Sequence, residues 1–163
     1  MEKGKFDVTK AIGHKYPSYS VEVKNNDMIL YALSIGFSRD PLNKEHFKFT
    51  YENSDNFTSF TTLPVVVSHK QLGIVTTTPN LPEINPMMIL HGEENLEVFK
   101  PLAAGMKVQI NETLVDVQDK GSGAALIMET EIVNIETKEV HAKILTTIFA
   151  RGVGGFGYKG KIK

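Results

Sequence analysis

Three long, β-rich segments in the second half of the chain constrain the fold most strongly. They run from Met106 to Val117, from Ala124 to Ile135 and from Val140 to Arg151. Each is rich in valine, isoleucine, threonine and leucine, which favour a pleated, half-buried surface. At about 3.3 Å per residue each would span roughly 35–40 Å, whereas the usual strand has about five to six residues. Because short turn sequences separate the segments, we expect an antiparallel meander that curls around another element.

The first half of the chain predicts shorter elements. A helix is expected over Asn26–Ile35, where apolar residues surround most of the axis. The alternation of aromatic and polar residues in Phe47–Tyr51 is typical of a strand. Pro64 suits the first turn of a helix, but the β-branched residues Val65–Val67 predict that this helix is short. The apolar run Met87–Leu90 predicts a buried strand that leads into His91.

Composition excludes several classes of function. The net charge of -1 argues against a nucleic-acid partner, and the absence of cysteine excludes disulfides and thiolate chemistry. No apolar run is long enough to span a membrane, and the charged start Met1–Lys5 lacks the apolar region of a secretory signal. With 163 residues the chain suits one domain, which we place at 1–157. Residues 158–163 form a basic C-terminal tail, expected to be a solvated end.

Several motifs occur together along the chain and carry a family resemblance. They are Tyr31–Gly36, Phe49–Glu52, Leu63–Pro64, Leu90–Glu93, Asp116–Gly123 and Arg151–Gly157. In this order the motifs resemble the N-terminal half of the MaoC-like dehydratase, or 2-enoyl-CoA hydratase 2, region of peroxisomal type 2 multifunctional enzymes. The resemblance covers nearly the whole chain. His-Gly-Glu, Asp-Lys-Gly-Ser-Gly and Gly-Gly-Phe-Gly are specific only in combination.

The resemblance implies an α+β hot-dog fold, in which a curved antiparallel sheet wraps around a shortened central helix. In that family the complete hydratase unit has two hot dogs in tandem, and this chain corresponds to the first. It therefore implies a second hot-dog domain or chain as partner, in a homodimer or a heterodimer. It also implies a peroxisomal location, with a cytoplasmic one otherwise.

The resemblance places the catalytic residues outside this chain. Hydration of an enoyl thioester needs a base, a proton donor and hydrogen-bond donors for the developing enolate. The family supplies an aspartate and a histidine from an Asp-x-Asn-Pro-Leu-His pattern in its second half. The comparable stretch here, Ser38–Asn43, has Ser38 in place of the aspartate and Asn43 in place of the histidine. Because neither side chain titrates near neutral pH, we expect no catalytic pair in this chain.

By family motif, ligand contacts are expected in two turns. His91 and Gly92 of the His-Gly-Glu motif and Lys120 are the expected contacts to a CoA thioester; Gly121, Ser122 and Arg151 are possible further contacts. Gly92 would let a ligand approach the backbone, and Lys120 offers a mobile charge to a phosphate. Each residue also has a structural reading, as a strand-end histidine, as a solvated lysine or as a glycine that serves a turn. No metal ion and no other cofactor are expected.

Three functions remain open on this reading. The first is the acyl-CoA-binding, non-catalytic half of an (R)-specific 2-enoyl-CoA hydratase or 3-hydroxyacyl-CoA dehydratase in fatty-acid β-oxidation. The second is a self-associating acyl-CoA-binding module without lyase activity. The third is an independent hot-dog thioesterase that takes its acid or base from Glu93, Glu94 or Asp40 across a homodimer interface.

Overall fold

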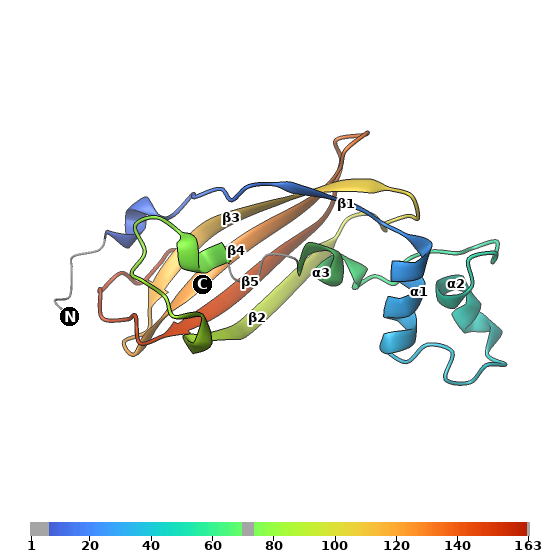
Figure 1. Cartoon of the computed structure of the whole chain (residues 1–163), viewed down its shortest axis with the longest axis horizontal. Coiled ribbons are helices and arrows are strands. Elements are labelled where there is room, and N and C mark those ends of the chain that lie inside the picture. Colours follow the sequence, from blue (N-terminus) through green and yellow to red (C-terminus); the bar gives the residue numbers. More distant parts are fainter. Residues whose placement is uncertain (1–6, 70–73, 163) are drawn as a thin grey trace.

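The fold is built on a five-stranded antiparallel sheet (Figure 1). The structure, a computed structural model, describes residues 7–69 and 74–162. The strand order is β1-β3-β4-β5-β2, with β1 (Tyr19–Glu22), β2 (Ile89–Val98), β3 (Lys107–Asp119), β4 (Gly123–Asn134) and β5 (Val140–Arg151). The three long segments expected from the sequence are therefore β3, β4 and β5. They pair in sequence order as antiparallel neighbours, which confirms the predicted meander.

The helices are few and short. Within the two described ranges the α-helices are α1 (Asn25–Ser34), α2 (Phe47–Thr50) and α3 (Leu63–Ser68), and 3-10 turns span Val8–Lys10, Lys44–His46, Ile74–Thr77 and Pro86–Met88. The helix expected over Asn26–Ile35 is confirmed as α1, and the six residues of α3 confirm the short helix expected at Pro64. In Figure 1, α3 lies beside the sheet, whereas α1 and α2 lie together beyond one end of it. No helix in these ranges is long and apolar enough to cross a lipid bilayer.

The strand expected over Phe47–Tyr51 is wrong, because this stretch forms α2. Its aromatic rings pack with others from the same lobe: the centroid of Phe49 lies 4.8 Å from that of Phe37 and 5.4 Å from that of Phe60. A stretch this short satisfies both strand alternation and one helical turn. The ring contacts of Phe49 with Phe37 and Phe60, which lie outside the segment, accompany the helical turn and not a strand.

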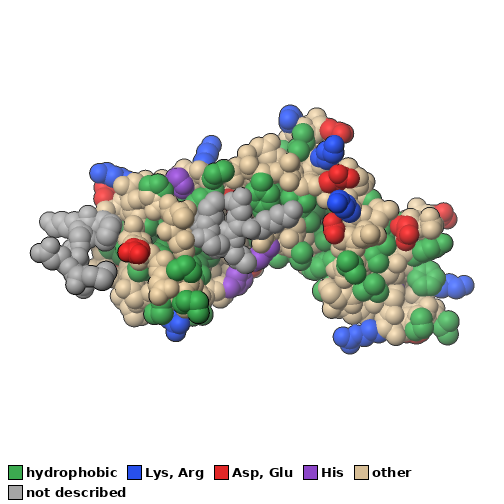
Figure 2. All heavy atoms as spheres, viewed as in Figure 1, with side chains coloured by type: hydrophobic (Ala, Val, Ile, Leu, Met, Phe, Trp, Pro, Cys, Tyr) green, Lys and Arg blue, Asp and Glu red, His purple; other side chains and the backbone are tan. Residues whose placement is uncertain are grey.

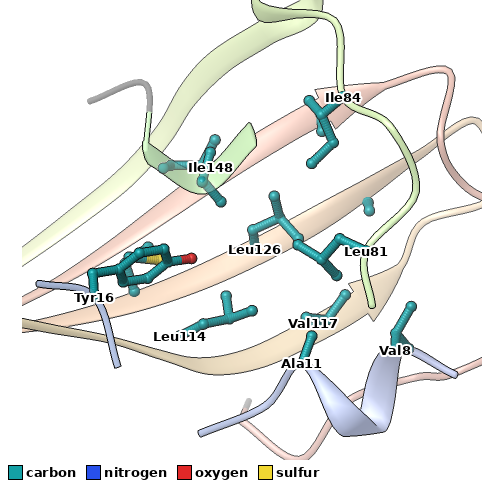
Figure 3. Packing of buried hydrophobic residues seen from close by; sticks show 13 residues of the cluster. Val8, Ala11, Tyr16, Leu81, Ile84, Leu114, Val117, Leu126 and Ile148 are labelled. Carbon is teal, nitrogen blue, oxygen red and sulfur yellow. The ribbon is translucent and has the colours of Figure 1, made fainter. Parts of the chain in front are cut away.

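The hydrophobic core covers one face of the sheet, here called the inner face. It is the face that bears Leu114, Leu126, Ile132, Ile144 and Ile148, each of which is buried. One cluster includes Leu114, Leu126 and Ile148 under residues from the N-terminal segment and from the loop before β2 (Figure 3). The second includes Ile132 and Ile144 with residues of α3. A curved sheet with a short helix against its inner face confirms the expected α+β hot-dog class.

The two edges of the sheet differ. The N-terminal segment lies along β3: β1 pairs with one part, and Gly13 and Tyr16 donate backbone hydrogen bonds to the carbonyls of Leu114 and Glu112 farther on. Strand β2 forms the opposite edge. The buried strand expected over Met87–Leu90 is wrong in part, because the strand begins at Ile89, and Met87 and Leu90 are 83% and 47% exposed. Met87 precedes the strand, and Leu90 pairs with Phe149 on the face of the sheet opposite to the inner face.

The C-terminal tail is bound more closely than the sequence suggests. The backbone N–H groups of Lys161 and Ile162 donate to Oδ2 of Asp116 at 2.7 and 2.8 Å, and Gln118 Nε2 donates to the carbonyl of Ile162 at 2.6 Å. Burial alone would raise the pKa of Asp116, but these donors outweigh burial and hold its pKa below the ordinary value. The tail backbone is thus attached to the outer face of β3, although the side chains of Lys159 and Lys161 are exposed.

Candidate functional site

A β-bulge at Gly92 determines which side chains of β2 face the core. The pairing with β5 shifts between His91, opposite Ile148, and Glu93, opposite Thr147. In a regular strand His91 and Glu94 would face opposite sides, since side chains alternate. The extra residue at the bulge instead brings His91 and Glu94 to the inner face and leaves Glu93 on the outer one.

Gly92 favours the bulge because a side chain there would crowd the neighbouring strand. A Cβ at this position would lie 3.0 Å from the carbonyl oxygen of Thr147 on β5. The glycine thus serves the close pairing of the two strands.

His91 and Glu94 form a hydrogen-bonded pair on the inner face. The His91 Nε2–H donates to Oε2 of Glu94 at 2.7 Å, with 47% of the histidine side chain and 16% of the glutamate side chain exposed. The other carboxylate oxygen of Glu94, Oε1, is buried and has no hydrogen-bond partner among the described residues. The ring of His69, at the end of α3, has its centroid 6.5 Å from that of His91. Figure 2 shows histidine side chains together near the middle of the molecule.

An apolar groove of about 600 Å³ lies between β1, α1 and α3. Its lining includes Val21, Leu30, Tyr31, Val66 and Val67. Val66 is 53% exposed and Leu30 is 64% exposed, so the groove is open to solvent. Because α3 carries Val66 and is followed directly by His69, this short helix connects the groove to the His91–Glu94 pair.

Lys120, Gly121 and Ser122 lie in the turn between β3 and β4, and Arg151 ends β5 beside them. Gly152 N–H donates to the Ser122 carbonyl at 2.8 Å, which joins the turn to the segment after β5. His91 pairs with Ile148, and Arg151 lies three residues farther along β5, about 10 Å by strand geometry. The expected contact residues thus form two groups at the same end of the sheet.

The carboxylate of Asp119 binds two glycine motifs together. It accepts hydrogen bonds from the backbone N–H groups of Gly121 at 2.7 Å, Gly155 at 2.9 Å and Gly157. We call these residues the clasp. The N–H donors, with that of Gly155 contributing most, lower the pKa of Asp119 to about 2. The glycines of the two motifs thus supply N–H donors to one structural carboxylate.

The Ser38–Asn43 stretch serves local structure around His46. Ser38 N–H donates to His46 Nδ1 at 2.9 Å, and Asn43 Nδ2 lies 3.3 Å from His46 Nε2. Asn43 also caps the following 3-10 turn by accepting the N–H of Glu45. Asp40 accepts the backbone N–H of Leu42 at 3.0 Å. Nδ1 of His46 is therefore held within its own lobe, and Asn43 lies beside Nε2.

Glu112 is a second carboxyl group with an unpartnered oxygen on the inner face. Its Oε2 is buried without a hydrogen-bond partner in the described part of the chain, and burial raises the pKa of this carboxyl group. Tyr16 lies beside it: burial raises the pKa of Tyr16 as well, and the charge of Glu112 adds to the effect. A raised folded-state pKa means that ionised Glu112 costs stability at neutral pH.

We expect Glu112→Gln to raise the melting temperature at pH 7.5 by roughly 2 °C or more, because the amide buries no charge. The gain should shrink as pH falls from the raised folded-state pKa toward the ordinary value of 4.5 and be nearly gone below it, where the carboxyl group is protonated in both folded and unfolded chains. Differential scanning fluorimetry from pH 3.5 to 8 measures it. A gain that stays constant with pH, or a loss at neutral pH, would contradict the assignment of a buried charge.

The sequence pointed to His91 and Lys120. It did not point to Asp119 or Glu112, and it did not show that Glu94 is the partner of His91. Side-chain alternation along a regular β2 would put His91 and Glu93 on the same face. A bulge at Gly92 puts His91 and Glu94 there instead, so this glycine is the signal in the sequence for Glu94. Within residues 7–69 and 74–162 no three His, Asp or Glu side chains are grouped as a metal site would require.

Comparison with known proteins identifies the family. Residues 21–152 match the family described as the MFE-2 hydratase 2 N-terminal domain. The chain belongs to this family. It is 33% identical over 152 residues to a probable enoyl-CoA hydratase 2 of Dictyostelium discoideum, covering 93% of this chain and 50% of that protein. It is 35% identical over 151 residues to the peroxisomal multifunctional enzyme type 2 of Mus musculus, covering 91% of this chain and 20% of that protein.

A solved structure supports the same assignment. The MaoC-like dehydratase of Phytophthora capsici superposes with a TM-score of 0.75 at 27% identity, covering 96% of this chain and 53% of that one. The hot-dog fold and the hydratase 2 resemblance expected from the sequence are therefore confirmed. The chain spans half or less of the length of the two curated relatives described above. It corresponds to a hydratase 2 N-terminal domain and is similar to part of a peroxisomal multifunctional enzyme type 2.

Proposed function

We propose that this chain is the acyl-CoA-binding, non-catalytic half of an (R)-specific 2-enoyl-CoA hydratase or 3-hydroxyacyl-CoA dehydratase. The groove beside α3 carries the proposal, because it is mostly apolar and open, and His69 at the end of α3 lies beside His91. A fatty acyl chain would lie in the groove, and the thioester end would face His91. A short α3 leaves room for a bulky acyl chain at this position.

The same proposal places the groups that transfer protons to and from the substrate outside this chain. Ser38 and Asn43, which stand where the family pattern has its aspartate and histidine, are engaged in holding His46. The acid and base would come from a second hot-dog domain. No further cofactor is needed for this reaction, since hydration moves only water and protons.

The second hot dog would pair with β2. This strand is the open edge of the described sheet; Leu90 within it is 47% exposed, and Met87 and Phe99, which flank it, are 83% and 48% exposed. An unpaired edge of ten residues is a ready template for another strand. We also propose a peroxisomal location, because the mouse relative carries that designation. A homodimer without lyase activity would use the same edge. Size-exclusion chromatography with an activity assay distinguishes this homodimer from a complex with a catalytic second hot dog.

Lys120→Ala is expected to weaken binding of decanoyl-CoA by about fivefold to tenfold, because an exposed charge near a phosphate contributes modestly. Isothermal titration calorimetry at low and moderate salt measures the change. Lys107→Ala, at the other end of the same strand, removes an equal charge away from the turn and should leave binding unchanged. Equal affinities for the native chain and the Lys120 variant would remove Lys120 from the site.

The His91–Glu94 pair also favours a second candidate, a hot-dog thioesterase. A histidine oriented by a carboxylate can serve as a general base toward water. Attack of water on the thioester carbonyl would release the fatty acid and free CoA thiol. Release of thiol from decanoyl-CoA, lost in His91→Ala, would establish this activity in place of the binding role.

A further inference from the structure

We propose that Glu94 is a ligand-binding residue with two tasks: one carboxylate oxygen fixes the ring of His91, and the other accepts an N–H donor of the bound thioester. In a CoA thioester the donor of matching chemistry is an amide N–H of the pantetheine arm. The inference rests on the proposed function, because it takes a CoA thioester as the ligand of the inner face. It deepens that function by naming the residue that recognises the arm.

The first task follows from the hydrogen bond between the two side chains. Oε2 of Glu94 lies 2.7 Å from Nε2 of His91, so the carboxylate holds the ring proton on Nε2 and fixes the ring orientation. Nearly half of the His91 side chain is exposed, whereas Glu94 is mostly buried. The arrangement therefore presents a fixed imidazole, with Nδ1 as the remaining nitrogen, to whatever occupies the inner face.

The second task follows from the other oxygen of the same carboxylate. Oε1 of Glu94 is buried, and no donor from the described residues reaches it. A buried acceptor without a donor is costly, so native proteins usually satisfy such atoms with protein, water or ligand. An ionised carboxylate is only an acceptor. A ligand that brings an N–H group to this position would satisfy the atom, whereas an apolar chain would not.

The position of Glu94 separates it from the other carboxylate with an unpartnered oxygen. Glu112 lies on β3, with β4 and β5 between it and β2. The N-terminal segment is hydrogen-bonded over it, since Tyr16 N–H donates to the Glu112 carbonyl at 3.0 Å. Glu94 lies on the open edge strand, beside the exposed ring of His91. Only the site on β2 combines an unsatisfied acceptor with an accessible partner.

The Gly92 bulge is the backbone device that builds this site. Without the bulge Glu93 would share the inner face with His91, and Glu94 would face outward. The chain therefore provides its own matched control. Glu93 is the adjacent residue with the same side chain, and it lies on the opposite face of the same strand.

The test compares two probes that differ in one N–H group. S-decanoyl-N-acetylcysteamine keeps an amide of the pantetheine arm. In the second probe an ester oxygen replaces the amide N–H, and the thioester is unchanged. Calorimetry with the full chain is expected to give about tenfold tighter binding of the amide. Glu94→Leu should reduce this preference to less than about twofold, and Glu94→Gln, which keeps one acceptor oxygen, should be intermediate. Glu93→Leu should keep the full preference.

The outcomes separate the inference from the proposed function. If the native chain binds neither decanoyl-CoA nor the probes, the proposed function fails and the inference fails with it. If it binds both probes equally, or if folded Glu94→Leu keeps the preference for the amide, only the inference is overturned. Binding of decanoyl-CoA without binding of either probe would place recognition in the nucleotide and would also overturn it. Melting temperatures of the variants establish that each is folded.

Discussion

Replacing Asp119 with alanine is expected to lower the melting temperature of the chain by roughly 5 °C or more. The carboxylate accepts N–H groups from Gly121, Gly155 and Gly157, so its removal leaves several backbone donors without their partner. The segment after β5 would then lose its attachment to the turn between β3 and β4. Differential scanning calorimetry measures the loss, and Asp55→Ala, in an exposed loop, serves as the control.

The pH dependence of this loss has a defined sign. Because the folded-state pKa of Asp119 is about 2, below the ordinary value of 3.8, the carboxylate stabilises the fold at pH values above about 4. That contribution declines as pH falls through the range from about 4 to 2. The gap in melting temperature between the native chain and Asp119→Ala should therefore narrow across this range. A gap that is independent of pH would mean that the charge of Asp119 does not stabilise the clasp.

The chain alone is expected to give no hydration of decenoyl-CoA or crotonyl-CoA above background. General acid–base catalysis typically supplies about 10²–10⁴-fold of rate, and the proposed function places both proton-transfer groups in a second hot dog. Absorbance of the conjugated thioester follows the reaction directly. Co-expression with the half of the Dictyostelium relative that this chain does not cover should give turnover if the two halves associate.

Catalysis by the isolated chain would contradict this expectation in a recognisable way. The side chains to substitute are His91 and Glu94, since they form a hydrogen-bonded histidine–carboxylate pair on the inner face. Turnover that persists in the purified chain and is abolished by His91→Ala would move the active site into this half. Turnover that survives His91→Ala and tracks a contaminant would leave the expectation intact.

Local patterns predicted the parts of the fold that depend on local energetics. The three long strands were predicted because their β-branched residues and alternating burial already favour a pleated surface in any context. The α1 helix was predicted because its run of apolar residues is long enough for a helix. Phe47–Tyr51 failed for the opposite reason, since a four-residue helix is decided by ring contacts with Phe37 and Phe60.

The same sequence patterns predicted only part of the candidate site. His91 and Lys120 were named because they lie in recognisable motifs, and their ligand contacts remain predictions. The role of Asp119 was not predicted, because its partners Gly155 and Gly157 lie 36 and 38 residues away in sequence. Lys159 and Lys161 suggested a solvated tail, yet it is the backbone of this tail that Asp116 binds.

The sequence by itself determined the class of this protein: a hot-dog sheet with long strands, a short helix after Pro64 and the motifs of a hydratase 2 N-terminal domain. Only the tertiary structure decided which carboxylate meets His91. Strand pairing with β5 forces a bulge at Gly92, and that one extra residue turns Glu94 inward and Glu93 outward. The physical reason is that burial and side-chain alternation are encoded along the chain, whereas register is fixed by the neighbouring strand.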